Sequence, residues 1–349
     1  MAPKFLLTNL HMAKVYFSIA LTFFLTACFP AKEPGSAQEF HLQGHTMGTT
    51  YNIKVVAKEA EYDLVKLQAD IDAALVQVNN EMSTYQKDSE ITLFNQSRGA
   101  EPMAISAGFR TVLTEALRLG DITGGMLDIT VGPLVNLWGF GPDYQPERIP
   151  NSEEQKVARA RIGLDKIILN EHGLSKTQAD AYIDLSTIAK GWGVDVIADL
   201  LQSKGIYNYL VEIGGEMRLK GFKANGTLWT IAIEKPITND RIAHQFVVPK
   251  DNAVATSGDY RNYIEVEGKR FSHIINPNTG LPIDHKLVSV TVLHPSSMTA
   301  DGLSTAIMVM GPEAGLAFAE QNDLAVMMIV KTANGFEEIN TVKFMPFLK

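Results

Sequence analysis

Hydrophobic residues recur at helical spacing in one long early stretch of the chain. Leu64, Leu67, Ile71, Leu75 and Val78 follow one another at intervals of three or four residues, which predicts an amphipathic helix over 61–80. Similar patterns, one of them closed by Gly205, predict further helices. These helices are expected at about 107–120, 131–137, 153–160, 187–204, 299–310 and 312–321.

Short runs rich in β-branched and aromatic residues predict the strands. They lie at 51–56, 208–213, 228–234, 244–248, 261–267, 271–275, 287–293 and 324–330. The later strands follow one another closely, through turns such as Glu267-Gly268 and Asn278-Thr279-Gly280, and such connections suit antiparallel hairpins. The pattern therefore predicts an α+β fold of mixed, largely antiparallel sheets with packed helices, rather than a Rossmann fold. Residues 40–349 contain no internal repeat, which favours a single catalytic body.

The N-terminal 27 residues have the pattern of a targeting segment. An apolar run at 15–27 follows Lys14 and is too short to span a bilayer, but suits a signal-peptide core. The run ends in Leu-Thr-Ala-Cys, which resembles a bacterial lipobox, so Cys28 is the predicted lipidation site. Residues 28–39 would then be a flexible tether on the periplasmic face of the inner membrane. The alternative is a stray buried cysteine beside an ordinary secretory cleavage site, and Met12 is an alternative start.

Composition and charge narrow the function classes. The chain has 349 residues, 46% of them hydrophobic and 20% charged, so it is globular. Lys and Arg number 31 against 39 Asp and Glu, a net charge of −8, which argues against nucleic acid as the main partner. A single cysteine cannot form a thiolate metal site, and the P-loop, dinucleotide and zinc-protease motifs are missing.

Short segments rich in Gly, Asp and Thr are spread along the chain at predicted turns and strand-to-helix junctions. They are GHTMGTTY at 44–51, MSTY at 82–85, GGMLDITVGP at 124–133, DLSTIAKG at 184–191, IGGE at 213–216, TSGDY at 256–260, HIINPNTG at 273–280 and ADGLSTA at 300–306. In content and order they resemble the motifs of the ApbE-type FAD:protein FMN transferases. The resemblance covers residues 44–310 and implies an α+β fold around a central flavin cleft. It also implies a magnesium-dependent enzyme that joins FMN from FAD to a Thr or Ser hydroxyl of an acceptor protein and releases AMP.

Two oxygen-bearing side chains in the last of these motifs form a candidate metal site. Asp301 and Thr305 are four residues apart, so they share one face of the predicted helix. Hard oxygen ligands suit Mg²⁺, which binds through few protein groups together with substrate phosphates. On spacing alone, Asp301 could equally cap the helix electrostatically, and Thr305 could pack against its neighbours without binding a ligand. The resemblance favours the metal and implies that main-chain oxygens of Thr187 and Ser304 complete its site.

The segment at 182–191 is a candidate phosphate site. It passes from strand to helix, with Ser186 as the predicted N-cap, so free N–H groups could bind a pyrophosphate beside the charge of Lys190. The alternative is that Asp184 only caps the helix and Lys190 is a solvated surface residue. The resemblance implies that Asp184 and Lys190 contact FAD.

Apolar and aromatic residues of other motifs are candidates for the flavin and adenine wall. Thioethers and aromatic faces suit flat rings, although Met and Tyr belong more often to a core. A buried Asp128 is harder to explain as core, because a buried carboxylate needs partners. The residues that the resemblance assigns to FAD here are Met47, Tyr85, Met126, Leu127, Asp128, Ser257 and Ile275.

His273 is the candidate general base, because it alone among the eight histidines is placed by the sequence near the expected chemistry. The alternative is a structural histidine, and Asp301 could also assist deprotonation. Three functions stay open: the transferase, an FAD pyrophosphatase in which water replaces the acceptor, and a noncatalytic FAD-binding lipoprotein. The resemblance implies Mg²⁺ as cofactor and FAD as substrate. It implies acceptor subunits of membrane redox complexes, of the sodium-translocating NADH:quinone oxidoreductase or a related electron-transport type.

Overall fold

The computed structural model describes residues 37–349, apart from 59–60, 142–147, 238–241, 260–262 and 267. The predicted signal peptide, Cys28 and residues 28–36 of the predicted tether lie outside the described residues. Within the described ranges, no helix combines the length and the apolar character needed to cross a membrane.

An eight-stranded sheet forms the centre of the fold, and all its neighbouring strands are antiparallel. Its order is β1-β2-β5-β6-β9-β14-β15-β16. The strands are β1 (Gln38–Thr46), β2 (Thr49–Ala57), β5 (Tyr209–Ile213), β6 (Glu216–Lys220), β9 (Ala253–Gly258), β14 (Leu287–His294), β15 (Ala325–Thr332) and β16 (Gly335–Asn340). The α+β fold with a largely antiparallel sheet is therefore confirmed.

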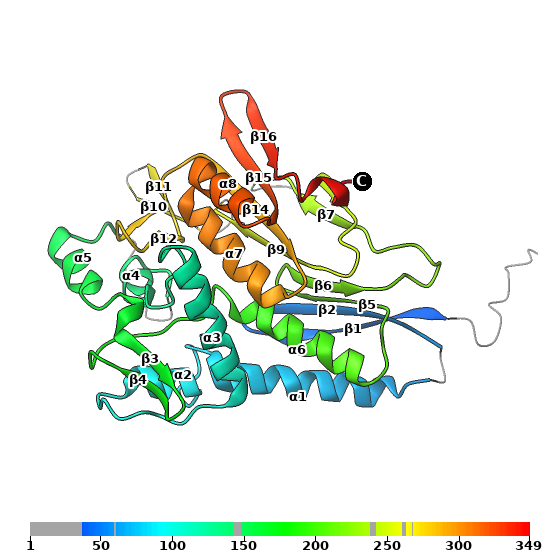
Figure 1. The fold of residues 1–349 in the computed structure, drawn as a ribbon, viewed down its shortest axis with the longest axis horizontal. Helices are drawn as coiled ribbons and strands as arrows, with labels where there is room; N and C mark the ends of the chain where they lie inside the picture. The colour runs from blue at the N-terminus through cyan, green and yellow to red at the C-terminus, as the bar shows by residue number, and fades with distance from the viewer. Residues whose placement is uncertain (1–36, 59–60, 142–147, 238–241, 260–262, 267) are drawn as a thin grey trace, which may run out of the picture. The chain divides into compact units, whose positions relative to one another are not determined.

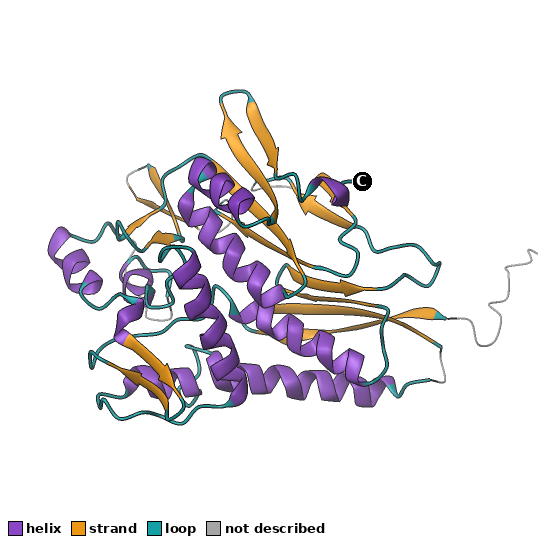
Figure 2. Ribbon diagram, viewed as in Figure 1, coloured by secondary structure: helices purple, strands orange, loops and turns teal. Residues whose placement is uncertain are grey.

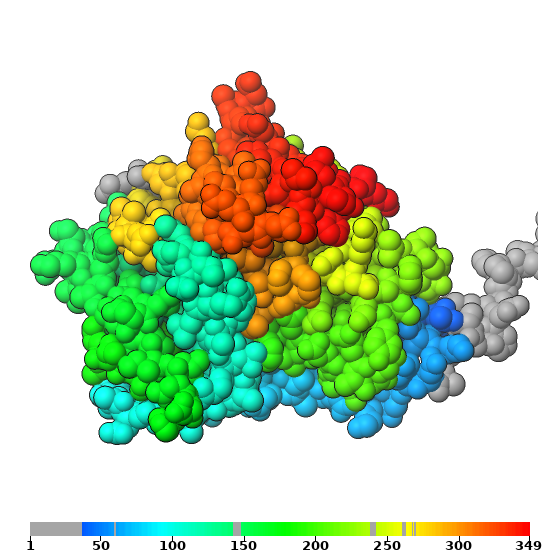
Figure 3. Space-filling view, in the orientation of Figure 1, coloured from blue at the N-terminus to red at the C-terminus, as the bar shows by residue number. Residues whose placement is uncertain are grey.

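Helices cover one face of this sheet and extend beyond it (Figures 1 and 2). Their side chains close over the strands in the space-filling view (Figure 3). The helices are α1 (Leu64–Met82), α2 (Glu90–Gln96), α3 (Ala107–Ile122), α4 (Gly132–Leu137), α5 (Ser152–Arg159), α6 (Ala189–Ser203), α7 (Ser297–Met310) and α8 (Pro312–Gln321). Paired short strands are β3 (Ile167–Asn170) with β4 (Gly173–Lys176), β7 (Ile231–Glu234) with β8 (Ala243–Val247), β10 (Tyr263–Val266) with β11 (Lys269–Ser272), and β12 (Ile275–Asn276) with β13 (Leu281–Pro282).

The core lies on both faces of the sheet, and β14 shows why its sequence is an unbroken apolar run. Val290 and Val292 belong to the cluster under the helices, whereas Val288 and Leu293 belong to a second cluster on the other side. That second cluster includes Trp229 and residues of the β7–β8 hairpin. A strand with both faces covered buries consecutive residues, so alternation disappears.

Several elements were not predicted, chiefly β1, α2, β3, β4, β6, β9 and β16. β1 is an edge strand whose residues alternate between the core and solvent, and it carries only Phe40 and Leu42 as large apolar residues. It also begins at Gln38, so the last two residues of the predicted tether are part of the sheet. β9 reads Ala-Val-Ala-Thr-Ser-Gly, and these small side chains fit under α7 without giving a strong strand signal.

The contact between α6 and α7 is unusually close. A Cβ atom on Gly191 would lie 2.4 Å from the carbonyl oxygen of Ser297, so only glycine allows this approach. Asp195, one turn further along α6, accepts hydrogen bonds from the N–H groups of Ser297 and Met298, both at 3.0 Å. It also accepts a bond from the Arg218 guanidinium at 3.0 Å. Asp195 thus satisfies the first N–H groups of α7 and fixes the helix that carries Asp301.

Replacement of Asp195 by alanine tests this link. We expect Asp195→Ala to lower the free energy of unfolding by about 3 kcal/mol, because it leaves the N–H groups of Ser297 and Met298 at the start of α7 without an acceptor and removes one of the two carboxylates on Arg218. Asp199→Ala is the matched control: it removes the other, 65% exposed carboxylate on Arg218 and should cost below about 1 kcal/mol. Urea unfolding of both variants measures the difference. Equal, small losses would show that the Asp195 bonds do not hold α7.

Candidate active site

A cavity of about 840 Å³ is lined by residues of α6, α7 and the central sheet. Segments far apart in the sequence form its wall, from Thr49 on β2 to Val309 on α7. Most of the residues that the sequence singled out line it: Tyr85, Met126, Leu127, Asp128, Asp184, Thr187, Lys190, Ser257, His273, Ile275, Asp301 and Thr305. Met47 and Ser304 lie outside this lining.

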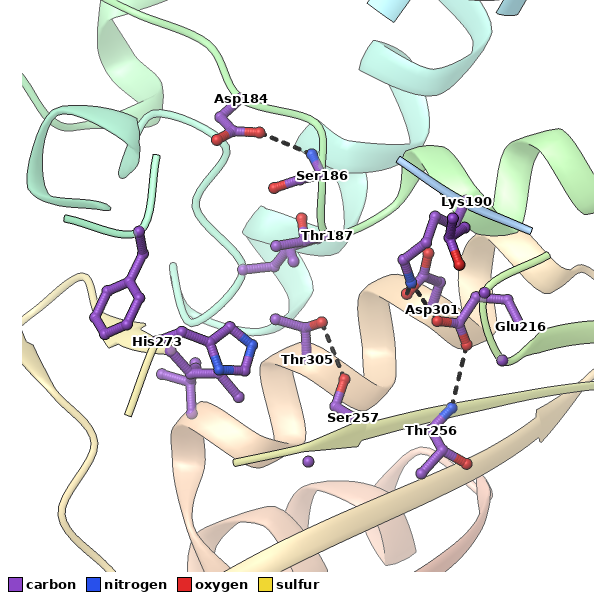
Figure 4. A pocket seen from close by; sticks show the side chains of 18 of the residues that line it. Asp184, Ser186, Thr187, Lys190, Glu216, Thr256, Ser257, His273, Asp301 and Thr305 are labelled. Carbon is purple, nitrogen blue, oxygen red and sulfur yellow. Dashed lines mark hydrogen bonds and ion pairs between the residues drawn. The ribbon is translucent and has the colours of Figure 1, made fainter. Parts of the chain in front are cut away.

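Asp301 and Thr305 face the cavity from the same side of α7, as their spacing predicts (Figure 4). The Ser257 hydroxyl on β9 lies 3.2 Å from the Thr305 hydroxyl and 2.7 Å from that of Ser304. Ser304 is fully buried and donates to the carbonyl oxygen of Asp301 at 2.9 Å. These hydroxyls join β9 to the helix turn that carries Asp301.

Asp301 is a buried carboxylate with two neighbours on α6. The N–H of Gly191 donates to its Oδ2 at 3.0 Å, and Nζ of Lys190 lies 3.9 Å from its Oδ1. Only 3% of the residue is exposed. Burial raises the pKa of Asp301 to about 7, with Lys190 opposing the shift. A cation at this carboxylate therefore competes with a proton near neutral pH.

Lys190 is not a solvated surface residue. Its ammonium contacts the carboxylate of Glu216, the first residue of β6, and all three charged groups point toward one another (Figure 4). Glu216 is 3% exposed, and its Oε2 accepts a hydrogen bond from the Thr256 N–H at 3.3 Å. The two carboxylates raise the pKa of Lys190, although burial opposes them, and the lysine stays charged.

The segment before α6 differs from the prediction at its cap. Ser186 is not the N-cap: α6 begins at Ala189 with Ile188 in the cap position, and no side chain caps it. Instead, the Asp184 carboxylate accepts the Ser186 N–H at 2.8 Å and forms a turn. The N–H of Gly191, in the first turn, is bound to Asp301 and is not available for a phosphate.

Thr187 has an unsatisfied polar group at this site. Among the described residues, its side-chain hydroxyl is buried without a hydrogen-bond partner, and Thr187 lines the cavity (Figure 4). A buried hydroxyl without a partner is costly unless a ligand satisfies it. In the described ranges, no three His, Cys, Asp or Glu residues gather as a metal cluster. The donor set of one carboxylate and hydroxyls fits Mg²⁺ held jointly with substrate phosphates.

The opposite wall is mostly apolar. Tyr85 is 73% exposed, whereas Leu127 and Ile275 are buried behind the surface of the cavity. Asp128 accepts the Thr130 N–H at 2.7 Å, so it orders its own loop, and burial raises its pKa. Met47 occupies the two-residue turn between β1 and β2 with a φ of 49°, and it packs against the core under α6.

His273 lies between β11 and β12 and faces the cavity (Figure 4). Its ring meets that of Phe140 edge to face, with centroids 6.2 Å apart. The ring thus stands on the same cavity wall as Thr305 and Ser257, in a place where it could accept a proton from a bound hydroxyl.

The sequence alone did not predict a role for Glu216, although this residue ends the motif at 213–216. The two glycines before it have φ values of 56° and 104° and form the tight turn between β5 and β6. An acidic residue directly after a Gly-Gly turn was the available signal. Its partner, Lys190, lies 26 residues away and meets it only in the fold.

The comparisons with known proteins agree with this geometry. The ApbE family model matches residues 47–328, and the chain belongs to the ApbE family. The FAD:protein FMN transferase of Vibrio cholerae is 55% identical over 312 residues, which cover 89% of this chain and 93% of the relative. The FAD:protein FMN transferase of Haemophilus influenzae is 48% identical over 326 residues, covering 91% and 93%.

Solved structures show the same fold. The flavin transferase ApbE of Vibrio cholerae superposes with a TM-score of 0.83 at 54% identity, covering 89% of this chain and all of that one. The apo form of the flavinyl transferase ApbE of Pseudomonas stutzeri has a TM-score of 0.82 at 38% identity, covering 89% and 96%.

Proposed function

We propose that this protein is an FAD:protein FMN transferase whose reaction takes place between Asp301 and His273. The observation that carries the proposal is that Asp301 and Thr305 present oxygen atoms from one face of α7 to a cavity of about 840 Å³, in a chain that belongs to the ApbE family. In the reaction, the hydroxyl oxygen of an acceptor Thr or Ser forms a bond to the FMN phosphorus. The bond from that phosphorus to the bridging oxygen breaks, and AMP leaves with this oxygen.

Some residues of the site would hold the metal ion, one would accept the proton and others would position FAD. Asp301, Thr305 and Thr187 would hold a Mg²⁺ ion, with main-chain oxygens of Thr187 and Ser304 as further ligands. The ion supplies positive charge that neutralises the pyrophosphate as its bond breaks. His273 accepts the proton of the acceptor hydroxyl at a ring nitrogen. Tyr85, Met126, Leu127, Asp128, Ser257 and Ile275, together with Asp184, Lys190 and Met47, are proposed to bind FAD.

Hydrolysis of FAD is the competing reaction at the same site, because water can replace the acceptor hydroxyl. Plain flavin storage is disfavoured by the presence of both Asp301 and Thr305 at the cavity, since binding a flavin does not by itself require metal ligands. For the acceptor, we propose subunits of membrane redox complexes of the sodium-translocating NADH:quinone oxidoreductase or a related type.

Intact mass of an acceptor subunit decides between transfer and hydrolysis. After incubation with the enzyme, FAD and Mg²⁺, we expect the acceptor to gain the mass of one FMN minus water, with one AMP formed per FMN attached. EDTA should abolish the gain, and added Mg²⁺ should restore it. Release of free FMN with an unchanged acceptor would support the pyrophosphatase instead, and full activity in EDTA would remove the metal from the proposal.

Substitutions on α7 test the metal role directly. We expect Asp301→Ala to bind FAD within about tenfold of the wild type, or roughly 1.4 kcal/mol, because the ring contacts remain. FMN transfer should slow at least about a hundredfold, since the negative charge that develops on the departing AMP phosphate is no longer neutralised. Thr305→Ala should show a smaller defect, because water can replace a neutral hydroxyl. Titration with FAD and single-turnover transfer measure the two effects, and normal turnover of Asp301→Ala would contradict the assignment.

For the cellular location, we propose attachment to the periplasmic face of the inner membrane through lipid on Cys28. Labelled fatty acid should enter the wild-type protein but not Cys28→Ser, and the variant should leave the membrane fraction. A variant that fractionates and labels like the wild type would show that another feature holds the protein on the membrane.

A further inference from the structure

We propose that Glu216 is a positioning residue for the metal site: it holds the Lys190 ammonium so that Lys190 does not neutralise Asp301 in place of the metal ion. The inference rests on the proposed function, because it takes Asp301 as a ligand of Mg²⁺. It assigns a role to a buried carboxylate that is not itself among the proposed ligands.

Three charged groups lie together at the wall of the cavity, and two of them are buried. Asp301 and Glu216 are each 3% exposed, and the Lys190 ammonium lies between their carboxylates on a side chain that is 30% exposed. With both carboxylates ionised, the net charge of the three groups is −1. Interactions between charges are stronger in such partly buried surroundings than in water. The position of this ammonium therefore determines how much negative charge Asp301 can offer to a cation.

The ammonium lies closer to Glu216 than to Asp301. It contacts the Glu216 carboxylate directly, whereas 3.9 Å separates it from Oδ1 of Asp301. Among the described residues, these two carboxylates are the ion-pair partners of Lys190. If Glu216 were neutral, the only remaining carboxylate partner would be Asp301. The ammonium would then compete with a divalent cation for the same oxygens.

The backbone around the β5–β6 turn positions both members of the Lys190–Glu216 pair. On the neighbouring strand β9, the Thr256 N–H donates to Oε2 of Glu216 at 3.3 Å. The stem of Lys190 passes over the turn before Glu216, since a Cβ atom on Gly214 would lie 3.4 Å from Cδ of Lys190. The β5–β6 turn thus places the carboxylate and makes room for the lysine that the carboxylate holds.

The test measures Mg²⁺ affinity directly, by isothermal titration calorimetry of the protein without and with bound FAD. Glu216→Gln keeps the shape and the bond to Thr256 but removes the charge. Glu212→Gln is the matched control, because Glu212 lines the same cavity from β5 yet binds Asn52 and the Gly215 N–H, both at 2.7 Å. The double variant Glu216→Gln/Lys190→Met removes the competing ammonium as well. Glu216→Asp keeps the charge, and thermal unfolding of every variant checks the fold.

We expect Glu216→Gln to weaken Mg²⁺ binding at least about tenfold, or 1.4 kcal/mol. Glu212→Gln should change the affinity by less than about threefold, because among the described residues Glu212 forms no ion pair with Lys190. The double variant should return to within about threefold of the wild type, and Glu216→Asp should bind better than Glu216→Gln. In transfer assays, Glu216→Gln should raise the KM for Mg²⁺ more than it lowers kcat.

Three results would overturn the inference. Glu216→Gln could bind Mg²⁺ like the wild type, which would show that the pair does not affect the metal. The double variant could bind as weakly as Glu216→Gln, which would make the role of Glu216 structural. Glu212→Gln could weaken binding as much as Glu216→Gln, which would indicate that any negative charge lining the cavity strengthens Mg²⁺ binding. A wild-type protein that binds no Mg²⁺ at all would instead overturn the proposed metal site, and this inference with it.

Discussion

The active site depends on the close approach of α6 and α7. Gly191 lets the backbones meet at Ser297, and Asp195 fastens the start of α7 to α6. Because α6 carries Lys190 and α7 carries Asp301, helix packing rather than a loop sets the separation of the ammonium and the carboxylate. The Gly191 N–H bound to Asp301 is part of the same contact. A shift of either helix would therefore change the electrostatics of the cavity.

The hydrophobic patterns correctly predicted those helices and strands whose own sequences carry a clear periodicity or apolar run. The apolar repeat of α1 and the dense apolar run of β14 are examples, and both lie close to their predicted bounds. Patterns failed where a neighbour supplies the packing. β9 has small side chains because α7 lies against it, and β1 is a sheet edge with few large apolar residues. The N-cap prediction at Ser186 is wrong because the Asp184 carboxylate accepts the Ser186 N–H and holds this residue in a turn before α6 begins at Ala189.

Most of the candidate residues predicted from the motifs line one cavity. The motifs did not predict the ion pairs of Lys190 with Glu216 and Asp301. Asp184 and Asp128 each use an oxygen on their own loop, so the structural interpretation and the ligand interpretation of these residues are compatible. The alternative for Lys190, a solvated surface lysine, is wrong because Glu216 and Asp301 enclose its ammonium. No local rule could show this, since the three residues come from a helix, a strand after a glycine turn and a second helix.

The spread of the cavity wall also constrains when the site can exist during synthesis. Its lining runs from Thr49 to Val309, and β9 must lie between β6 and β14 before α7 has a surface to cover. Contacts between such distant residues form late, because a long loop has to close before they contribute. A chain that is still being made has the β1–β2 hairpin early but lacks Asp301 until α7 has been added. The growing polypeptide therefore lacks the α7 side of the cavity until most of the domain has been made.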